Sequence, residues 1–433
     1  MRQRAVFSIE NLPLWKDRLL HWAAAQDPGI YLDSNGHEGD RLAEKGWECL
    51  AAGGAMRILE CPAGNAFGQL KDFQNDTRDW LFGFLSYDLK NETERLSSRH
   101  FDGIGFPDLG FFQPEIVAGI RNGYLEIFFT NQDLKAIFDY FKTFDQNVLR
   151  KKFNVIGPEN ILKPRIWRED YLKIVECIRA HIVEGDLYEM NLCQEFFAEK
   201  TGLDPVAVFG RLNLIGLAPA SAFLRWHERY LMSASPERFL QKRGSRLVSQ
   251  PIKGTRRRGS TLQEDDSIRA ELASNEKDRA ENVMIVDLVR NDLARNCLPG
   301  SIRADELFGI HTFETVHQMI STVSGVLRPG THPVDALRDA FPMGSMTGAP
   351  KVMAMQLIEQ YEQTRRGLYS GAVGYFDPEG NFDFNVVIRS ILYNADTGYV
   401  SAQVGGAIVY DSEPEAEYEE CLVKLSAMQR ALH

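Results

Sequence analysis

Hydrophobic and polar residues follow two different periods along the chain, and each period predicts a different kind of element. In the first third, short apolar runs bounded by turn residues predict strands at Trp80–Tyr87 and Tyr124–Phe129. Residues 131–153 have the spacing of a helix, and the polar stretch at 157–160 is a candidate linker.

The pattern is more regular after Trp167. A helix is predicted over Glu169–Glu184 and ends at Gly185, because glycine readily adopts the left-handed conformation that closes a helix. Strands are expected to dominate from there to Ile252. Further helices are predicted at residues 274–296, at 350–361 and after a capping box at Ser412–Glu415. Further strands are predicted at residues 371–376, 382–392 and 399–410.

Strands and helices do not alternate regularly, which argues against a doubly wound parallel sheet. We therefore expect an α+β fold in which large antiparallel β-sheets form a sandwich with flanking helices. A chain of 433 residues exceeds what one compact core usually supports. We expect two regions, an amino-terminal region at residues 1–160 and a second region at 161–433.

The net charge of −11 argues against nucleic acid or an anionic membrane as the main partner, because an acidic surface repels both. The six cysteines form no Cys-x-x-Cys pair, which favours reduced and mostly buried thiols. The apolar stretches near the start are too short for a signal peptide or a membrane span, so a cytoplasmic protein is expected.

Glu281 shares one face of its predicted helix with Ile285 and Leu288. A carboxylate in line with apolar residues is costly to bury unless a cation meets it. The alternative is an ordinary ion pair with Lys277 or Arg279.

In the last predicted helix, Glu417, Glu420 and Lys424 lie on one stripe. An exposed pair of Glu420 and Lys424 would stabilise the helix by only about 0.2–0.5 kcal/mol. Carboxylates from two helices would also suit Mg²⁺, which takes one or two protein carboxylates and keeps waters and substrate oxygens. The spacing leaves both interpretations open.

Three further segments have anion-binding chemistry. Gly344–Lys351 is a turn of small residues that leads into a helix N-terminus, a geometry that binds anions. Arg389 lies in an otherwise apolar predicted strand and needs an anionic partner. Gly405 and Gly406 interrupt the next predicted strand, where exposed amides could reach a carboxylate. A purely structural explanation is open for each of the three.

Lys253 lies in the turn-like segment Pro251–Thr255 and is followed by three arginines at 256–258. A lysine amine is nucleophilic only when neutral, and both neighbouring cations and burial lower its pKa. The cluster therefore predicts a reactive amine. A solvated basic turn is the simpler alternative.

The order of these features resembles the chorismate-utilising enzymes, among them the anthranilate, aminodeoxychorismate, isochorismate and salicylate synthases. The resemblance covers about Trp167 to Leu432. In the first 160 residues, Tyr31–Ser34 and Leu85–Asp88 are similar to parts of an amino-terminal region that can hold a tryptophan in related synthases. The matching motifs are Glu184–Tyr188, Ser235–Arg238, Pro251–Thr255, Ile285–Asp292, Thr347–Lys351, Gly371–Tyr375 and Ile388–Ser390.

This resemblance implies Mg²⁺ as the cofactor, with Glu281 and Glu420 as its ligands and Glu417 near it through a water. It implies that Tyr375 and Arg389 grip the enolpyruvyl carboxylate of chorismate. Gly405, Gly406 and Lys424 are implied to line the pocket on the side of the other carboxylate and the metal. Glu237 is implied to act as the acid–base catalyst and Lys253 as the nucleophile. His317 and Thr347 are implied to lie in the pocket near the ring hydroxyl and the side chain of chorismate.

Position 253 separates members of this family. The corresponding turn has alanine in anthranilate synthases and lysine in aminodeoxychorismate synthases. The implied reaction is attack of Lys253 at C2 of chorismate, followed by addition of ammonia at C4, and it yields 4-amino-4-deoxychorismate for p-aminobenzoate and folate synthesis. The alternatives are an anthranilate synthase, a subunit that serves both reactions, or a regulatory subunit without catalysis.

Glu189 departs from the family pattern. Isochorismate and salicylate synthases have a lysine near this position to activate water, and the amino-transferring relatives usually have glutamine. The absence of this lysine argues against water addition. The sequence also contains no Gly-x-Cys-x-Gly nucleophile turn, so a separate glutamine amidotransferase subunit is expected to supply the ammonia.

Overall fold

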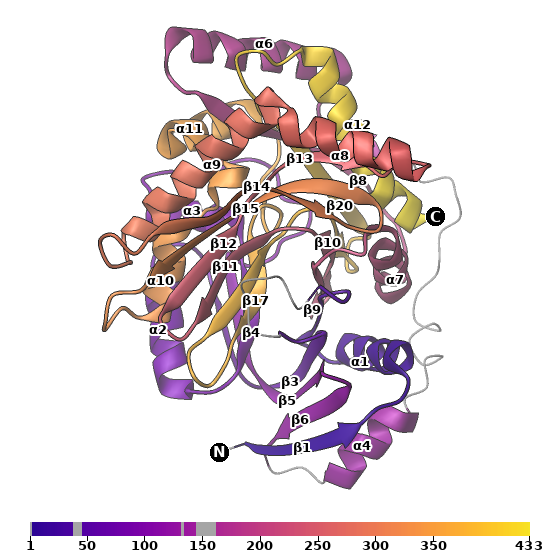
Figure 1. Ribbon diagram of the computed structural model, residues 1–433. Coiled ribbons are helices and arrows are strands. Elements are labelled where there is room, and N and C mark those ends of the chain that lie inside the picture. Colours follow the sequence, from indigo (N-terminus) through magenta and orange to yellow (C-terminus); the bar gives the residue numbers. More distant parts are fainter. Residues whose placement is uncertain (1, 38–45, 131–133, 144–161) are drawn as a thin grey trace.

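The computed structural model describes residues 2–37, 46–130, 134–143 and 162–433 (Figure 1). The candidate linker at 157–160 lies outside these residues. Of the helix predicted for 131–153, the described part is α4, Leu134–Thr143.

Antiparallel strands make up most of the structure. In chain order they are β1 Gln3–Ser8, β2 Gly29–Asp33, β3 Cys49–Cys61, β4 Leu81–Leu85, β5 Leu109–Arg121, β6 Tyr124–Phe129, β7 Lys163–Pro164, β8 Glu189–Ala198, β9 Ala220–Trp226, β10 Arg229–Ser235, β11 Arg238–Arg243, β12 Arg246–Gln250, β13 Ile252–Arg257, β14 Arg303–Thr312, β15 Val316–Val326, β16 Gly348–Ala349, β17 Ala372–Phe376, β18 Phe382–Val386, β19 Ser390–Asn394 and β20 Tyr399–Ile408.

Helices flank these strands. Besides α4 they are α1 Leu12–Ala25, α2 Ala66–Thr77, α3 Lys90–Thr93, α6 Arg168–Glu184, α7 Pro205–Gly216, α8 Leu262–Ser274, α9 Glu276–Ala294, α10 Pro333–Ala340, α11 Lys351–Tyr361 and α12 Pro414–Leu432, with short 3₁₀ turns at Tyr87–Leu89 and Gly344–Met346.

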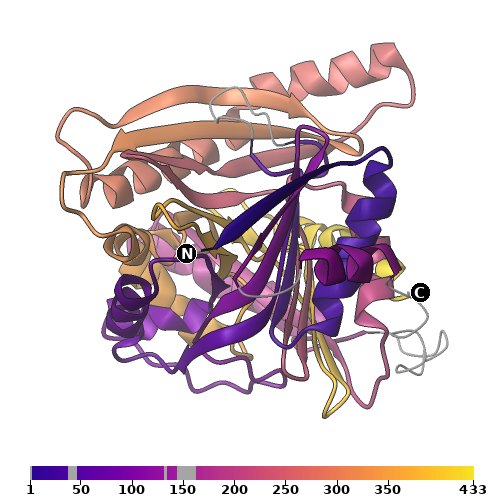
Figure 2. The ribbon, with the colours of Figure 1, turned by 90° about the horizontal axis from the view of Figure 1, so that it is seen from below.

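The long strands β3 and β5 are the point from which two sheets diverge (Figures 1 and 2). Along one branch the pairing order is β3, β2, β9, β10, β19, β20 and β8. Along the other branch the order is β5, β4, β17, β18, β11, β12 and β15, with β13 and β14 also on β15. The pairings of β2 with β9 and of β4 with β17 join strands of residues 1–160 directly to strands of residues 161–433.

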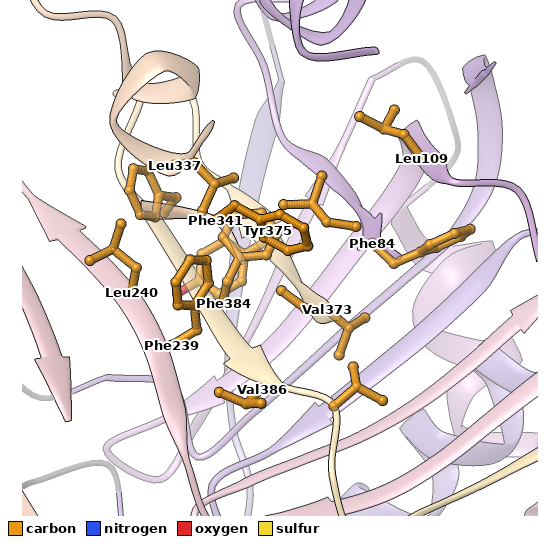
Figure 3. Close-up of a cluster of buried hydrophobic side chains, with 14 of the residues drawn as sticks. Phe84, Leu109, Phe239, Leu240, Leu337, Phe341, Val373, Tyr375, Phe384 and Val386 are labelled. Atoms are coloured by element: carbon orange, nitrogen blue, oxygen red, sulfur yellow. The ribbon is translucent and has the colours of Figure 1, made fainter. Parts of the chain in front are cut away.

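The side chains of the strands divide between two cores, as the period of two predicts. On β2, Ile30 lies in a core that contains residues of both sheets and continues to α2, α9 and α10. Figure 3 shows the part of this core around Phe239, Phe341 and Phe384. The adjacent Tyr31 lies in a second core, which packs one sheet against α1, α6, α7 and α12. The expected α+β fold with antiparallel sheets and flanking helices is therefore confirmed.

Strands dominate before Ile252, as predicted, although helix α7 lies among them; Pro205 opens it, and the Asp204 carboxylate accepts hydrogen bonds from two amides of its first turn. The helix predicted at 274–296 is α9, and Asn275 caps it. The predicted start of the last helix is wrong in detail. Ser412 does not form a capping box, because its hydroxyl donates to Glu417 Oε1 instead.

Two further corrections concern candidate site residues. Gly405 and Gly406 do not break a strand: both pair in register with β8 inside β20. Arg389 is not in a strand, because it lies between β18 and β19 with a φ of +50°.

Five of the six cysteines are buried and Cys177 is exposed, and all are free, as the sequence predicts. Among the described residues, no helix combines the length and apolar composition that crossing a membrane requires.

Candidate functional site

Lys253 lies on β13 with only 9% of its surface exposed. Its ammonium nitrogen is 2.5 Å from Oε1 of Glu189, the first residue of β8, and 3.9 Å from Oε2 of Glu281 on α9. Two sheet strands and one helix thus bring together three residues that are far apart in the sequence.

The electrostatic surroundings of Lys253 differ from the sequence prediction. The three following arginines turn to other partners: Arg256 to Glu271 and Asp278, Arg257 to Glu264, and Arg258 to Asp265. Burial opposes the charge of Lys253, but the carboxylates of Glu189 and Glu281 outweigh it and raise the pKa of the ammonium. The prediction that neighbouring cations lower the pKa of Lys253 is therefore wrong.

The turn at Gly344–Lys351 organises the site rather than presenting a free helix N-terminus. Gly348 and Ala349 form β16, which pairs with Met190 and Glu189 at the start of β8. A Cβ at Gly348 would lie 2.1 Å from the Glu189 carbonyl oxygen, so only glycine allows this approach. At the end of the turn, Lys351 forms an ion pair with Asp292 at 2.7 Å.

Glu237 lies between β10 and β11 and is buried. Its Oε1 accepts a hydrogen bond of 2.6 Å from the Ser345 hydroxyl, which belongs to the same organising turn. Burial raises the pKa of Glu237 to about 7, although Ser345 and the nearby Lys253 charge oppose the rise. A carboxyl group with such a pKa can both give and accept a proton near neutral pH.

Carboxylates from α9 and α12 converge next to this group. Lys277 Nζ lies 4.0 Å from Glu281 Oε1 and 3.8 Å from Glu417 Oε1, so one ammonium links the two helices. Burial raises the pKa of Glu281 to about 7 and also raises the pKa of Glu417. A Cβ at Gly406 would lie 3.2 Å from Glu417 Oε2 and 3.4 Å from Glu420 Oε1, so the glycine keeps space open beside these oxygens.

Lys424 completes this side of the site. Its ammonium is 2.5 Å from Glu420 Oε1 and donates a hydrogen bond of 2.6 Å to the Gly405 carbonyl oxygen. Although burial acts in the opposite direction, the Lys424 charge lowers the pKa of Glu420. Glu281 on α9 and Glu417 and Glu420 on α12 offer the kind of carboxylate oxygen that Mg²⁺ prefers.

Arg389 has the character of a ligand-binding cation. It is half-buried, and within the described part of the chain no carboxylate forms an ion pair with its guanidinium. Burial lowers its pKa, and the groups that act in the opposite direction are Tyr369 and Glu420. The anionic partner that the sequence led us to expect is therefore not supplied by the described protein residues.

The structure does not bring Tyr375 to Arg389. Tyr375 lies in the core between the sheets, near Val373 and Phe384 (Figure 3). Its hydroxyl accepts a hydrogen bond of 3.0 Å from Arg243, and it lines a separate cavity of about 110 Å³ together with Asp33 and Ser34. The nearby phenol is Tyr369, which is buried directly before the Gly371–Tyr375 motif.

His317 and Thr347 are also used elsewhere. The two ring nitrogens of His317 lie 2.9 Å from Thr312 Oγ1 and 2.9 Å from Asp265 Oδ1, so this buried side chain connects β15 to α8. The Thr347 hydroxyl donates to the carbonyl oxygens of Met343 and Gly344 and closes the turn. None of these contacts reaches Lys253; they hold neighbouring elements together, and the pocket positions of both residues stay a prediction.

Sequence reasoning missed Ser345 and Tyr369. Both lie in or next to motifs that were recognised, but a small hydroxyl or a phenol in such a motif does not reveal which way it points. Their positions follow from the pairing of β16 with β8 and from the course of the chain before β17.

The chain is similar to several known proteins. The profile of the chorismate binding enzymes matches residues 27–430. The aminodeoxychorismate synthase of Streptomyces griseus is 46% identical over 61% of this chain, and this chain spans only 36% of that protein. Aminodeoxychorismate synthase component 1 of Klebsiella aerogenes is 38% identical over 81% of this chain and 76% of its own length.

Solved structures show the same fold. Anthranilate synthase component I from Streptococcus pneumoniae superimposes with a TM-score of 0.75 at 25% identity, over 91% of this chain and 94% of that chain. From its matched profile, its relatives and the arrangement of its strands, this chain belongs to the chorismate binding enzyme family.

Proposed function

We propose that this chain is the chorismate-aminating subunit of an aminodeoxychorismate synthase, which converts chorismate and ammonia to 4-amino-4-deoxychorismate for p-aminobenzoate and folate synthesis. The observation that carries the proposal is the buried Lys253, whose nitrogen contacts Glu189 and Glu281. The relatives from Streptomyces griseus and Klebsiella aerogenes that bear this name support it.

In the first half-reaction, Lys253 passes one proton to Glu189 and attacks ring carbon C2 as a neutral amine. The ring double bonds shift, and the bond between C4 and its hydroxyl breaks. Glu237 in its protonated form gives a proton to the hydroxyl, which leaves as water; its pKa of about 7 suits this task at neutral pH. The product is a secondary ammonium that joins Lys253 to the ring.

In the second half-reaction, ammonia attacks C4 and the bond between C2 and the Lys253 nitrogen breaks, with its electron pair returning to that nitrogen. The new ammonium at C4 gives a proton to Glu237, and Lys253 recovers its proton from Glu189. Chorismate and ammonia have then become 4-amino-4-deoxychorismate and water. The two displacements place the amine para to the ring carboxylate, whereas one direct attack at C2 would place it ortho.

Mg²⁺ is the proposed cofactor, with Glu281 and Glu420 as ligands and Glu417 near the ion through a water. When bound, the ion would neutralise the ring carboxylate of chorismate and favour departure of the hydroxyl. The open space beside Gly406 and the oxygen donors of two helices support this site.

The chain's own cations suit the carboxylates of the substrate. Arg389, which has no ion-pair partner among the described residues, is proposed to bind the enolpyruvyl carboxylate with Tyr369 in the place predicted for Tyr375. Lys424 and the backbone around Gly405 are proposed to line the side of the other carboxylate. Ammonia is proposed to come from a glutamine amidotransferase subunit, and the complex to act in the cytoplasm.

Incubation of the purified chain with chorismate, Mg²⁺ and ammonium tests the proposal, with mass spectrometry of the product and of Lys253 during turnover. We expect 4-amino-4-deoxychorismate and a transient adduct on Lys253. Anthranilate as the product would make the chain an anthranilate synthase instead. Chorismate that is bound and never consumed, even at high ammonium, would indicate a regulatory subunit.

A further inference from the structure

Glu189 has an unusual environment for a carboxylate. It is 1% exposed, and its Oε1 accepts a hydrogen bond of 2.5 Å from Lys253 Nζ. The other carboxylate near this ammonium, that of Glu281, lies at 3.9 Å. Glu189 is therefore the group that fixes where the nitrogen of the flexible lysine side chain lies.

The backbone of Glu189 is itself held on both sides along the strand. Glu189 pairs with Ala349 in β16. The backbone amide of the preceding Tyr188 donates to the Ala349 carbonyl oxygen, and the amide of Asn191 donates to the Thr347 carbonyl oxygen. A side chain on such a paired strand is placed more firmly than one on a loop. The absence of a Cβ at Gly348 is what allows this pairing.

The second oxygen of Glu189 is free. Oε2 is buried and has no hydrogen-bond partner among the described residues. A buried carboxylate oxygen without a partner is costly, so such an oxygen in a site points to a donor that arrives with a ligand. Chorismate brings one hydroxyl donor, at C4, which the proposed reaction assigns to Glu237. Ammonia brings N–H donors with no other acceptor assigned to them.

We propose that Glu189 positions both nitrogen nucleophiles of the reaction, Lys253 Nζ through Oε1 and the incoming ammonia through Oε2. This inference rests on the proposed function. The two nitrogens attack ring carbons C2 and C4, which are separated by a single ring carbon, so two oxygens of one carboxylate can serve them in turn. A glutamine offers one acceptor oxygen instead of two, and its amide nitrogen would meet the second nucleophile with another donor, which gives the glutamate at this position a specific purpose.

Steady-state kinetics of Glu189→Gln with ammonium as the nitrogen source test this inference. We expect kcat to fall about 10²-fold, because Lys253 is no longer held in place for attack. The KM for ammonia should rise about tenfold or more through loss of the Oε2 acceptor, while the KM for chorismate changes little. Rapid quenching without ammonia should show slower formation of the Lys253 adduct by mass spectrometry.

Two other variants make the result interpretable. Tyr188→Phe changes the exposed neighbour of Glu189 and should keep wild-type kinetics. Glu189→Asp keeps two acceptor oxygens but withdraws both by one methylene. It should slow adduct formation and raise the ammonia KM less than Glu189→Gln does, and it replaces Glu189→Gln if that variant does not fold.

The outcomes separate this inference from the proposed function. Wild-type production of 4-amino-4-deoxychorismate, together with an unchanged kcat and ammonia KM in Glu189→Gln, would overturn the inference alone. An equal rise of both KM values would also overturn it, because it would indicate a general distortion of the site. A wild-type chain that makes no 4-amino product would overturn the proposed function and this inference with it.

Discussion

The Ser345 hydroxyl donates a hydrogen bond of 2.6 Å to Glu237 Oε1, and both side chains are buried. Ser345 comes from the turn that also pairs with the strand of Glu189. One turn therefore controls the position of two carboxylates with different tasks, the proposed acid and the partner of Lys253.

Replacement of Ser345 by alanine should change the pH dependence of the reaction. The Ser345 bond stabilises the ionised form of Glu237 and lowers a pKa that burial raises to about 7, so Ser345→Ala should raise it further. Because Glu237 must be protonated to release the hydroxyl, the fall of kcat with increasing pH should move to higher pH. Ser426→Ala, at an exposed serine, is the control. A shift to lower pH would contradict the assignment.

Removal of the Glu237 charge should stabilise the folded protein above neutral pH. The pKa of Glu237 is raised from 4.5 to about 7 on folding. The contribution of this group to the free energy of unfolding is therefore fully present below pH 4.5 and is lost as the pH rises through about 7. The free energy of unfolding of Glu237→Gln should therefore exceed that of the wild type by up to about 3 kcal/mol at pH 8. Near pH 4.5 the two free energies should differ little. Urea unfolding at both pH values measures this, with Glu379→Gln as an exposed control. Equal curves at pH 8 would refute it.

The ion pair between Lys253 and Glu189 should be visible as a coupling in stability. Lys253→Ala leaves a buried carboxylate without its cation and should destabilise the protein by about 3–5 kcal/mol. Lys253→Ala combined with Glu189→Gln should recover part of this loss, because the unpaired charge is gone. Denaturant unfolding of the wild type, the two single variants and the double variant gives the coupling energy. Additive losses would show that the two side chains do not interact.

Lys277 should compete with a metal ion for the carboxylates of α9 and α12. Its ammonium lies within 4.0 Å of both Glu281 and Glu417 and is half exposed. Lys277→Met should tighten Mn²⁺ binding about threefold to tenfold, since an exposed ion pair contributes up to about 1 kcal/mol. Electron paramagnetic resonance of free Mn²⁺ measures the affinity. Lys173→Met, at an exposed lysine paired with Asp170, is the control, and weaker binding by Lys277→Met would contradict the prediction.

Arg389 should matter for the substrate and not for folding. Because no ion pair of the described residues uses its guanidinium, Arg389→Met should leave the unfolding free energy nearly unchanged. The KM for chorismate should rise about 10²-fold through loss of a charge-assisted contact. Thermal unfolding and steady-state kinetics of the same preparation test both statements. A large loss of stability would show that the residue has a structural partner.

The sequence alone determined the class of fold and the group of residues worth testing. The irregular order of helices and strands indicated antiparallel sheets, and helical spacing indicated Glu281, Glu417 and Glu420 as candidates. Lys253 was indicated by the arginines that follow it, and Glu237 by the resemblance to the chorismate-utilising enzymes. Such patterns can be recognised because periodicity and motif spacing are properties of the chain itself.

Only the tertiary structure decided how these residues act. Lys253 looked like part of a basic cluster because three arginines follow it, yet strand pairing directs those arginines to α8 and α9 and surrounds Lys253 with carboxylates. Tyr375 and Tyr369 stand close together in the sequence, but burial between the sheets removes Tyr375 from the site. Charge environment and side-chain direction depend on neighbours brought from distant parts of the chain, and a linear pattern does not contain those neighbours.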